Sequence, residues 1–296
     1  MTQNQGYSYR HVLGPKSAGH STLSYLTNYF PHSTEAEWER RLEAGEIVVA
    51  NKSAIGCESL KAGTVLTWNR PGWIELDVPM DFSVIYEDAH LIAVDKPSGL
   101  PTLPGAGYYK NTLLSLVKEN FAPARPLHRL GRATSGIVLF ALNAESAAIL
   151  THQWPNIQKQ YQALSTAVSD CCSYDIRSPI GELDHPRLGK VYAATAAGKR
   201  ARSVARTLER REESTVFEVD LHTGRPHQIR IHLAFIGHPL VGDPLYATGG
   251  IPRGDQPGLP GEGGYWLHAK RIAFDHPESG NRVDLTAPLP KTLRCD

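Results

Sequence analysis

Residues 128–141 read HRLGRATSGIVLFA, a polar segment that runs directly into an apolar one. The apolar part, continued to residue 142, is rich in Ile, Val, Leu and Phe and predicts a buried strand. AESAAILTH (144–152) then predicts a short helix. The polar part sets Arg, His, Thr and Ser beside glycines. Buried charge is costly unless it is paired, so we expect residues 128–136 to line a cleft.

Two more segments share this polar character. Lys159, Gln160 and Tyr161 open a strand-like run, and TGRPHQIRIH (223–232) precedes an apolar helical stretch. Neither is explained by core packing, so we expect both to line a cleft that a substrate or partner fills.

The elements around these segments alternate irregularly. Predicted strands cover 82–88, 90–96, 161–168, 203–208 and 216–222, and predicted helices cover 113–120 and 226–235, the latter with Pro226 in its first turn. This order predicts an α+β fold with a mixed, largely antiparallel central sheet and flanking helices, not a doubly wound parallel sheet.

The first 80 residues predict a separate small α+β domain. Ser21 is expected to cap a helix that ends near Pro31, and Thr34 with Glu37 forms a capping box for a second helix closed by Gly45. Strands are predicted at 46–50 and 64–68. The segment 70–82 carries two prolines and is expected to connect domains 1–80 and 81–296.

The overall charge is nearly balanced, with 31 Lys and Arg against 30 Asp and Glu. A nucleic-acid-binding protein often has a larger basic excess, so only a local patch can attract phosphates. Such a patch lies between Arg187 and Arg211, where eight basic residues accompany the single acid Glu209. As a strand, 199–206 would place Arg200, Arg202 and Arg206 on one face. The alternative is a solvated edge strand whose charges prevent sheet-to-sheet association.

Several protein classes are disfavoured. No apolar run is long enough to span a bilayer, and the first 20 residues lack the apolar core of a signal peptide. Four cysteines without metal-ligand spacing indicate a reduced, cytoplasmic-type interior. Gly198-Lys199 lacks the other residues of a phosphate-binding loop, the histidines from 222 to 238 lack HExxH spacing, and Ser135 is not in a GxSxG motif.

Four motifs, in order, resemble those of the RluA-type pseudouridine synthases. They are YEDAHLIAVDKPSGLPTLPG (86–105), HRLGRATSGIVLFA (128–141), TGRPHQIRIHLAFIGHPLVGDPLY (223–246) and LHAKRIAFDHPESG (267–280). The N-terminal domain resembles an S4-type RNA-binding module through Phe30-Pro31, Gly45–Val49 and Leu60–Gly63. It carries seven basic and eight acidic residues, so an orienting role is the alternative to RNA binding.

The resemblance implies isomerisation of uridine in ribosomal or transfer RNA by a monomer, without metal or organic cofactor. It assigns Tyr161 to the ring beneath a flipped base and Arg230 to the partner of the catalytic carboxylate. Arg129, Arg132 and Lys159, with Lys199, Arg200, Arg202 and Arg206, are the expected RNA contacts. Gly131, Tyr161 and Arg230 are then expected at one cleft, with Arg230 unpaired unless another acid reaches it.

The departure from the family pattern is Gly131, which stands where HRLD carries the catalytic aspartate. Glycine supplies no nucleophile, acid or base. Asp95, Asp184 and Asp243 are candidate substitutes, with Asp95 the foremost and a packing role expected for Asp243. The alternative is a catalytically inactive RNA-binding protein of the same fold.

Overall fold

The computed structural model describes residues 2–254, 257–259, 261 and 263–295. The chain forms two compact units, Met1–Leu76 and Asp77–Asp296, so their boundary falls within the 70–82 segment. No helix among these described residues is long and apolar enough to cross a membrane.

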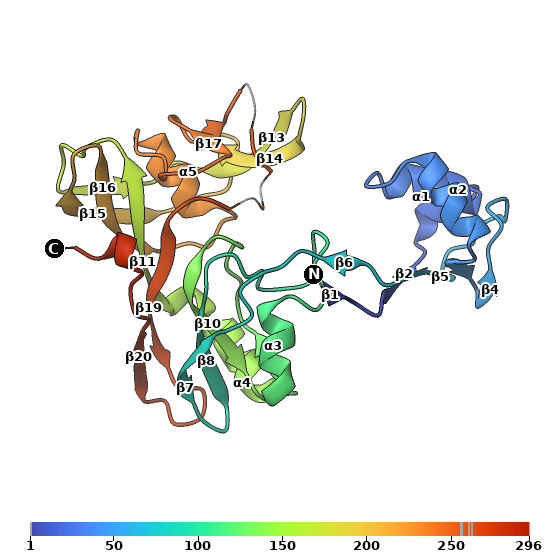
Figure 1. The fold of residues 1–296 in the computed structure, drawn as a ribbon, viewed down its shortest axis with the longest axis horizontal. Helices are drawn as coiled ribbons and strands as arrows, with labels where there is room; N and C mark the ends of the chain where they lie inside the picture. Colours follow the sequence, from blue (N-terminus) through green and yellow to red (C-terminus); the bar gives the residue numbers. More distant parts are fainter. Residues whose placement is uncertain (1, 255–256, 260, 262, 296) are drawn as a thin grey trace. The chain divides into compact units, whose positions relative to one another are not determined.

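The first unit combines two helices with short strands (Figure 1). Its elements are β1 (Thr2–Gln3), β2 (Tyr7–Val12), α1 (Thr22–Tyr29), α2 (Glu35–Glu43), β3 (Ile47–Val49), β4 (Lys52–Ser53), β5 (Val65–Arg70) and β6 (Ile74–Glu75). The predicted caps are confirmed: the Ser21 hydroxyl accepts from the backbone N–H of Ser24, and Thr34 with Glu37 forms the capping box. Strands in the order β2-β5-β3-β4 form one sheet, and β1 pairs with β6.

Helix α2 anchors the core of this unit through Trp38, which is 1% exposed. The Arg41 guanidinium lies 4.5 Å from the centre of the Trp38 ring and 4.4 Å from that of Trp68. These cation–π contacts join α2 to the sheet.

The second unit carries most of the regular structure. Its helices are α3 (Leu113–Asn120), α4 (Ala144–Gln153) and α5 (Gln228–Phe235). Its strands are β7 (Ser83–Glu87), β8 (Leu91–Lys96), β9 (Arg125–Pro126), β10 (Ser135–Ala141), β11 (Gln158–Thr166), β12 (Ser173–Ile176), β13 (Ile180–His185), β14 (Gly189–Ala194), β15 (Ser203–Arg210), β16 (Ser214–Leu221), β17 (Tyr246–Ala247), β18 (Ile251–Pro252), β19 (Leu267–Asp275) and β20 (Arg282–Thr286).

One large sheet organises this unit in the order β12-β15-β16-β11-β19-β10-β8-β7, with β20 added to β19 and β9 to β10. Among the described strands, only β10 and β19 pair in parallel. Where these two strands pair, Gly136 has φ +103°, and a Cβ on this residue would lie 2.3 Å from the Ala269 carbonyl oxygen. Only glycine allows this close approach. The predicted α+β fold with a mainly antiparallel sheet is confirmed.

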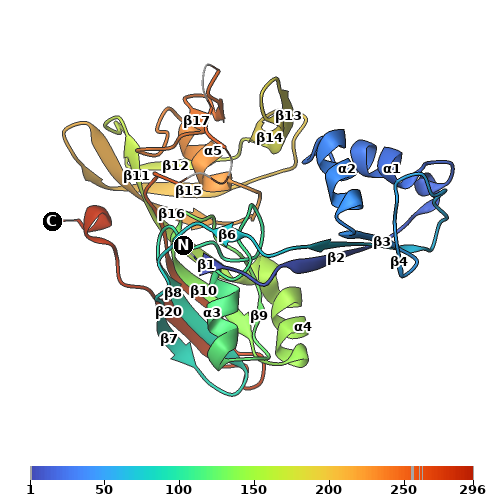
Figure 2. The same ribbon diagram turned by 45° about the vertical axis from the view of Figure 1, so that its right-hand side comes forward.

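Strand alternation divides the side chains between two faces of the sheet. Val94, Val138 and Tyr161 belong to a core that α3 and α5 cover. Ala93 and Ile137 belong to a second core on the opposite face, which α4 covers. Figure 2 shows α3 and α4 near strands β8 and β10.

Two sequence expectations are wrong. Helix α5 begins at Gln228 with His227 as its N-cap, so Pro226 precedes the helix instead of occupying its first turn. The strand predicted over 199–206 begins only at Ser203, so Lys199, Arg200 and Arg202 precede it, and β15 lies between β12 and β16 and is not an edge strand. The acidic residues that pair with its arginines come from the neighbouring strands, and counting charges along the sequence does not reveal them.

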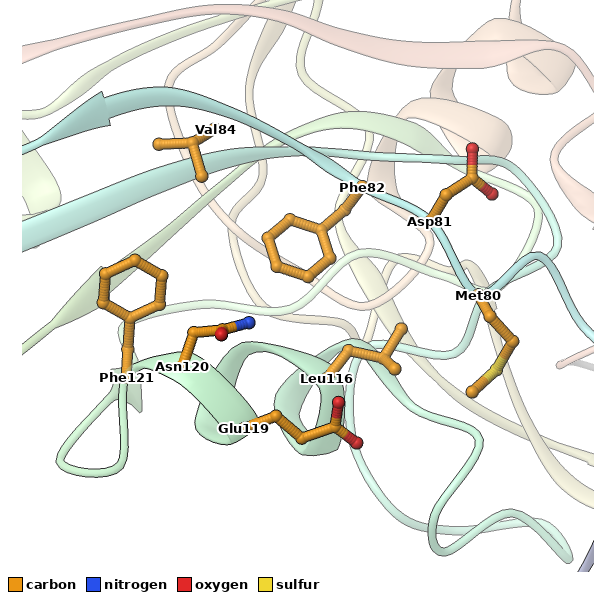
Figure 3. Close-up of a pocket in the computed structure, with 8 residues that line it drawn as sticks. All are labelled: Met80, Asp81, Phe82, Val84, Leu116, Glu119, Asn120 and Phe121. Atoms are coloured by element: carbon orange, nitrogen blue, oxygen red, sulfur yellow. The ribbon is translucent and has the colours of Figure 1, made fainter.

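A hollow of about 550 Å³ opens beside the C-terminal end of α3. Figure 3 shows Phe82 and Met80 facing Leu116, Asn120 and Phe121 across it. None of the residues that line this hollow belongs to the three polar segments, so it is not the predicted cleft.

Candidate active site

The loop before β10 carries Gly131 and is fixed by side chains of other segments. The Thr102 hydroxyl donates to the Leu130 carbonyl (2.9 Å), and the His128 imidazole Nε2 accepts from the backbone N–H of Leu139 (3.0 Å). The Thr134 N–H donates to the Gly131 carbonyl (3.1 Å). The loop therefore presents Gly131 in one defined conformation, and Gly131 itself is exposed.

Lys96 ties this loop to the segment after β8. Its ammonium donates to the carbonyl oxygens of Pro97 (2.8 Å), Leu100 (2.7 Å) and Arg132 (3.2 Å), and the residue is fully buried. Burial lowers the pKa of Lys96 to about 7, while the neighbouring Asp95 charge acts in the opposite direction. The three carbonyl acceptors satisfy every donor of the ammonium.

Arg230 projects from α5 and forms an ion pair with Asp243. Its Nε and Nη2 each donate to a carboxylate oxygen of Asp243 at 2.7 Å, and both side chains are buried. Asp243 also accepts from the backbone N–H groups of Leu245 and Tyr246. Burial is the largest single influence and acts to lower the pKa of Arg230, but the hydrogen bond and charge of Asp243, together with Tyr265 and Tyr246, raise the pKa overall. Asp243 is thus the acid that reaches Arg230, and its carboxylate is fully occupied.

Tyr265 connects Arg230 with Gly131, and sequence reasoning missed it. The guanidinium lies 4.3 Å from the centre of the Tyr265 ring, and the phenol oxygen lies 3.4 Å from the Thr134 hydroxyl oxygen. A Cβ placed on Gly131 would lie 2.8 Å from the same phenol oxygen. The only hint in the sequence is the aromatic pair Tyr265-Trp266 before the LHA motif, and this does not distinguish Tyr265 from a core residue.

Tyr161 lies in β11 and is 9% exposed. It shares a hydrophobic cluster with Leu130, Ile229 and Tyr265, which are neighbours of Gly131 and Arg230 in sequence or space. Burial raises the pKa of Tyr161 to about 12, so its ring is neutral at physiological pH.

The other two candidate substitutes for the catalytic aspartate, Asp95 and Asp184, do not lie beside Gly131. Asp95 follows Val94 in β8, so its side chain is on the face opposite Tyr161, where it lines a hollow of about 410 Å³ with Ser135 and His268. Tyr265 also borders this hollow, but Asp95 is not among the atoms within 4 Å of a Cβ at Gly131. Burial raises the pKa of Asp95. Asp184 is exposed on the β13–β14 hairpin opposite Lys190.

The predicted RNA-contacting residues fall into two groups. Several are engaged within the protein: Arg132 donates to the Tyr108 hydroxyl and Gly261 carbonyl, Lys159 to the Trp154 carbonyl, Arg202 to Asp175, and Arg206 pairs with Glu218 and Asp220. Arg129, Lys199 and Arg200 are exposed. Arg129 also lies near the site, because its charge contributes, after burial and Arg230, to lowering the pKa of His227 to about 4.

His227 adopts a left-handed backbone conformation, with φ +54°. Its ring nitrogen Nδ1 lies 2.8 Å from the Tyr246 hydroxyl, whose ring also contacts Arg230. Non-glycine residues in this region are uncommon and concentrate at functional sites. Among the described residues, no group of three or more His, Cys, Asp or Glu is placed to hold a metal ion.

Comparison with known proteins decides the family. The model of the RNA pseudouridylate synthase family matches residues 90–235. An uncharacterised RNA pseudouridine synthase of Synechocystis is 40% identical over 92% of this chain and 94% of its own length. The chain belongs to the RNA pseudouridine synthase family.

Other members of the family extend this likeness. RNA pseudouridine synthase 5 of rice is 34% identical and aligned over 98% of this chain and 89% of its own length. Ribosomal large subunit pseudouridine synthase D of Xanthomonas campestris is 32% identical over 96% and 89% of the two chains. The solved structure of human RNA Pseudouridylate Synthase Domain Containing 1 shares the fold, with a TM-score of 0.57 over 73% of this chain and 87% of the human chain at 23% identity.

Proposed function

We propose that the chain isomerises uridine to pseudouridine in structured RNA, either ribosomal or transfer RNA. Membership of the RNA pseudouridine synthase family supports the reaction, and the second unit supports it physically. The carrying observation is that Tyr265 links the Gly131 loop to the buried Arg230–Asp243 pair, while Tyr161 belongs to the same hydrophobic cluster.

Each residue has a role in this proposal. A target uridine must leave its stack, and the Tyr161 ring is the platform for the extruded base. Exposed Arg129, Lys199 and Arg200 attract the phosphates beside it. The S4-like first unit binds or orients the RNA, and the enzyme acts as a monomer without metal or organic cofactor.

The rival function is RNA binding without isomerisation, and one observation favours it. Within 4 Å of a Cβ at Gly131, the described residues outside its chain neighbours provide only the hydroxyl oxygens of Tyr265 and Thr134. No carboxylate among them stands in for the aspartate of the HRLD pattern.

Release of tritium from RNA labelled at C5 of uridine separates the two functions. The isomerase exchanges the C5 hydrogen because C5 becomes the atom joined to the sugar. We expect release from unmodified ribosomal or transfer RNA transcripts. Stable binding of these transcripts with no release from any of them would favour the rival function.

A further inference from the structure

The space in front of Gly131 is filled by a hydroxyl group. A Cβ at this position would lie 2.8 Å from the Tyr265 phenol oxygen. An aspartate carries its carboxylate oxygens two bonds beyond Cβ, a reach of roughly 2.4 Å. The phenol oxygen therefore stands about as far from the backbone of residue 131 as the oxygens of the missing carboxylate would.

Backbone strain does not explain why residue 131 is glycine. The structure gives φ in the left-handed range for many glycines, but Gly131 is not one of them. The restriction comes from contact instead: a Cβ would lie 2.8 Å from the phenol oxygen, so one of the two groups would have to move. Gly131 and Tyr265 thus fit together as a pair: the glycine makes room for the hydroxyl.

The surroundings of Tyr265 suit a reacting phenol. The Arg230 guanidinium lies 4.3 Å from the ring centre, where a fixed positive charge stabilises negative charge on the phenol. Asp243 holds that guanidinium through two bonds of 2.7 Å. The Thr134 hydroxyl lies 3.4 Å from the phenol oxygen. The ring is 6% exposed, and the adjoining Gly131 backbone is open to solvent.

We propose that Tyr265 is the catalytic nucleophile of this chain, in place of the aspartate absent at residue 131. This role rests on the proposed uridine isomerisation. Tyrosine is a known nucleophile at sugar carbons, as in sialidases.

The step balances without a further reactant. The Tyr265 oxygen forms a bond to C1′ of the uridine, the C1′–N1 bond breaks, and uracil leaves with that electron pair. The phenol has first lost its proton to solvent, and N1 of the departing uracil takes a proton from solvent. The base then turns, C5 bonds to C1′, and the C1′–oxygen bond breaks to return its electron pair to Tyr265. The C5 proton neutralises the phenolate, which leaves pseudouridine and the starting enzyme.

The acids do not fill this role. Asp243 gives its oxygens to Arg230 and two backbone N–H groups, and Asp184 is on a solvent-exposed hairpin. Asp95 borders the same hollow as Tyr265, but it is not among the atoms within 4 Å of a Cβ at Gly131.

The decisive variant is Tyr265→Phe in the full chain, assayed by tritium release from C5-labelled ribosomal and transfer RNA transcripts. We expect a loss of at least about a thousandfold in kcat, as for removal of other nucleophiles, with RNA binding unchanged. Tyr174→Phe is the matched control, because the Tyr174 hydroxyl also bonds to neighbouring side chains but lies on β12. It should retain the activity of the unmodified chain.

Replacing Tyr265 by 3-fluorotyrosine keeps the shape and the hydroxyl. The fluorinated phenol ionises more readily, so the acidic limb of the pH–rate profile should move to lower pH. A structural role would leave the profile in place.

The outcomes separate the two proposals. Suppose that the unmodified chain releases tritium. The role of Tyr265 is then overturned if kcat of Tyr265→Phe is within tenfold of the unmodified chain, or if 3-fluorotyrosine does not move the pH–rate profile. In both cases the proposed isomerase activity still stands. Loss of tritium release in Asp95→Asn but not in Tyr265→Phe would also overturn the role of Tyr265 and leave the isomerase activity in place. No release by the unmodified chain from any transcript overturns the isomerase, and the nucleophile with it.

Discussion

At the scale of single residues, the candidate site depends on two contacts between distant parts of the chain. Thr134 and Tyr265 meet across 131 positions, and Arg230 meets Asp243 across 13. In both, a charged or polar side chain is withdrawn from water and must find its partner inside the protein. Small changes at these contacts should therefore have measurable effects.

Gly131→Ala tests the fit between glycine and phenol. The new Cβ would lie 2.8 Å from the Tyr265 oxygen, so the hydroxyl must move. Because a misplacement of about 1 Å can cost a hundredfold in rate, we expect kcat for tritium release to fall about ten- to a hundredfold. Gly14→Ala is the control, since a Cβ there meets nothing within 4 Å. Equal kcat in both variants would contradict the proposed fit.

Gly131→Asp should not raise activity by itself, because its carboxylate competes with the same hydroxyl for space. In the Tyr265→Phe background the hydroxyl is gone, and we expect Gly131→Asp to restore measurable release. Single and double variants compared under one set of conditions give the coupling between the two positions. A single Gly131→Asp variant faster than the unmodified chain would show that the phenol does not do the chemistry.

Asp243→Asn should destabilise the second unit. It removes the negative charge that pairs with the buried Arg230 guanidinium, and breaking such pairs costs about 3–5 kcal/mol. Denaturant unfolding of the second unit measures the loss. Arg230→Met combined with Asp243→Leu removes both charges and should lose less than Asp243→Asn, whereas an equal or greater loss would show that packing dominates.

At the scale of secondary structure elements, the sequence predicts the features that depend on residues close together in the chain. Helix starts at Ser21 and Thr34 were predictable because a cap and its target N–H are three residues apart. The α+β class followed from the order of strands and helices. The departure from the family motif at Gly131 is visible in the sequence alone. Pairings across the sheet were not predictable, because strand order is set by tertiary contacts.

The basic segment between Arg187 and Arg211 illustrates this limit. Along the sequence, Arg206 has one nearby acid, but in the sheet Glu218 and Asp220 of β16 approach its guanidinium at 3.6 and 2.6 Å. Arg202 is paired in the same way with Asp175. The charge available for RNA is therefore smaller than the count of arginines indicates. The position of Tyr265 at the site could not be predicted for the same reason, because the residues that it contacts come from other segments of the chain.

This difference within the basic segment can be measured through salt dependence. Lys199→Gln with Arg200→Gln removes two exposed charges, so the slope of log affinity against log salt should fall by about one per lost phosphate contact. Arg206→Gln removes a charge already neutralised by acids and should leave the slope nearly unchanged. A larger effect from Arg206→Gln would assign the phosphate contacts to the paired arginines instead.

At the scale of the whole molecule, buried imidazoles make stability depend on pH. Burial lowers the pKa of His128, His227 and His268 to about 4, with Lys159 adding to the effect at His128 and Arg230 at His227. The unfolded chain binds these protons near pH 6.5. Stability is therefore full above that value and falls as pH drops from about 6.5 to about 4.

His268→Gln should weaken this dependence. His268 is 1% exposed, and its neutral form contributes up to about 3 kcal/mol of pH-dependent stability. Calorimetric unfolding at pH 7 and pH 5 should show a smaller difference in this variant than in the unmodified chain. His152→Gln, which alters an exposed side chain, should keep the original difference. If His268→Gln also keeps it, burial of His268 is not the source.

The most direct measurement of the central claim is the nucleoside composition of an RNA transcript before and after incubation with the unmodified chain. Unmodified ribosomal and transfer RNA transcripts are digested, and pseudouridine is quantified per RNA molecule. We expect one transcript class to gain pseudouridine towards a whole number per molecule, with equivalent tritium released from C5-labelled RNA. RNA that binds the protein tightly, yet contains no pseudouridine after prolonged incubation at saturating enzyme, would contradict the claim that this chain is an isomerase.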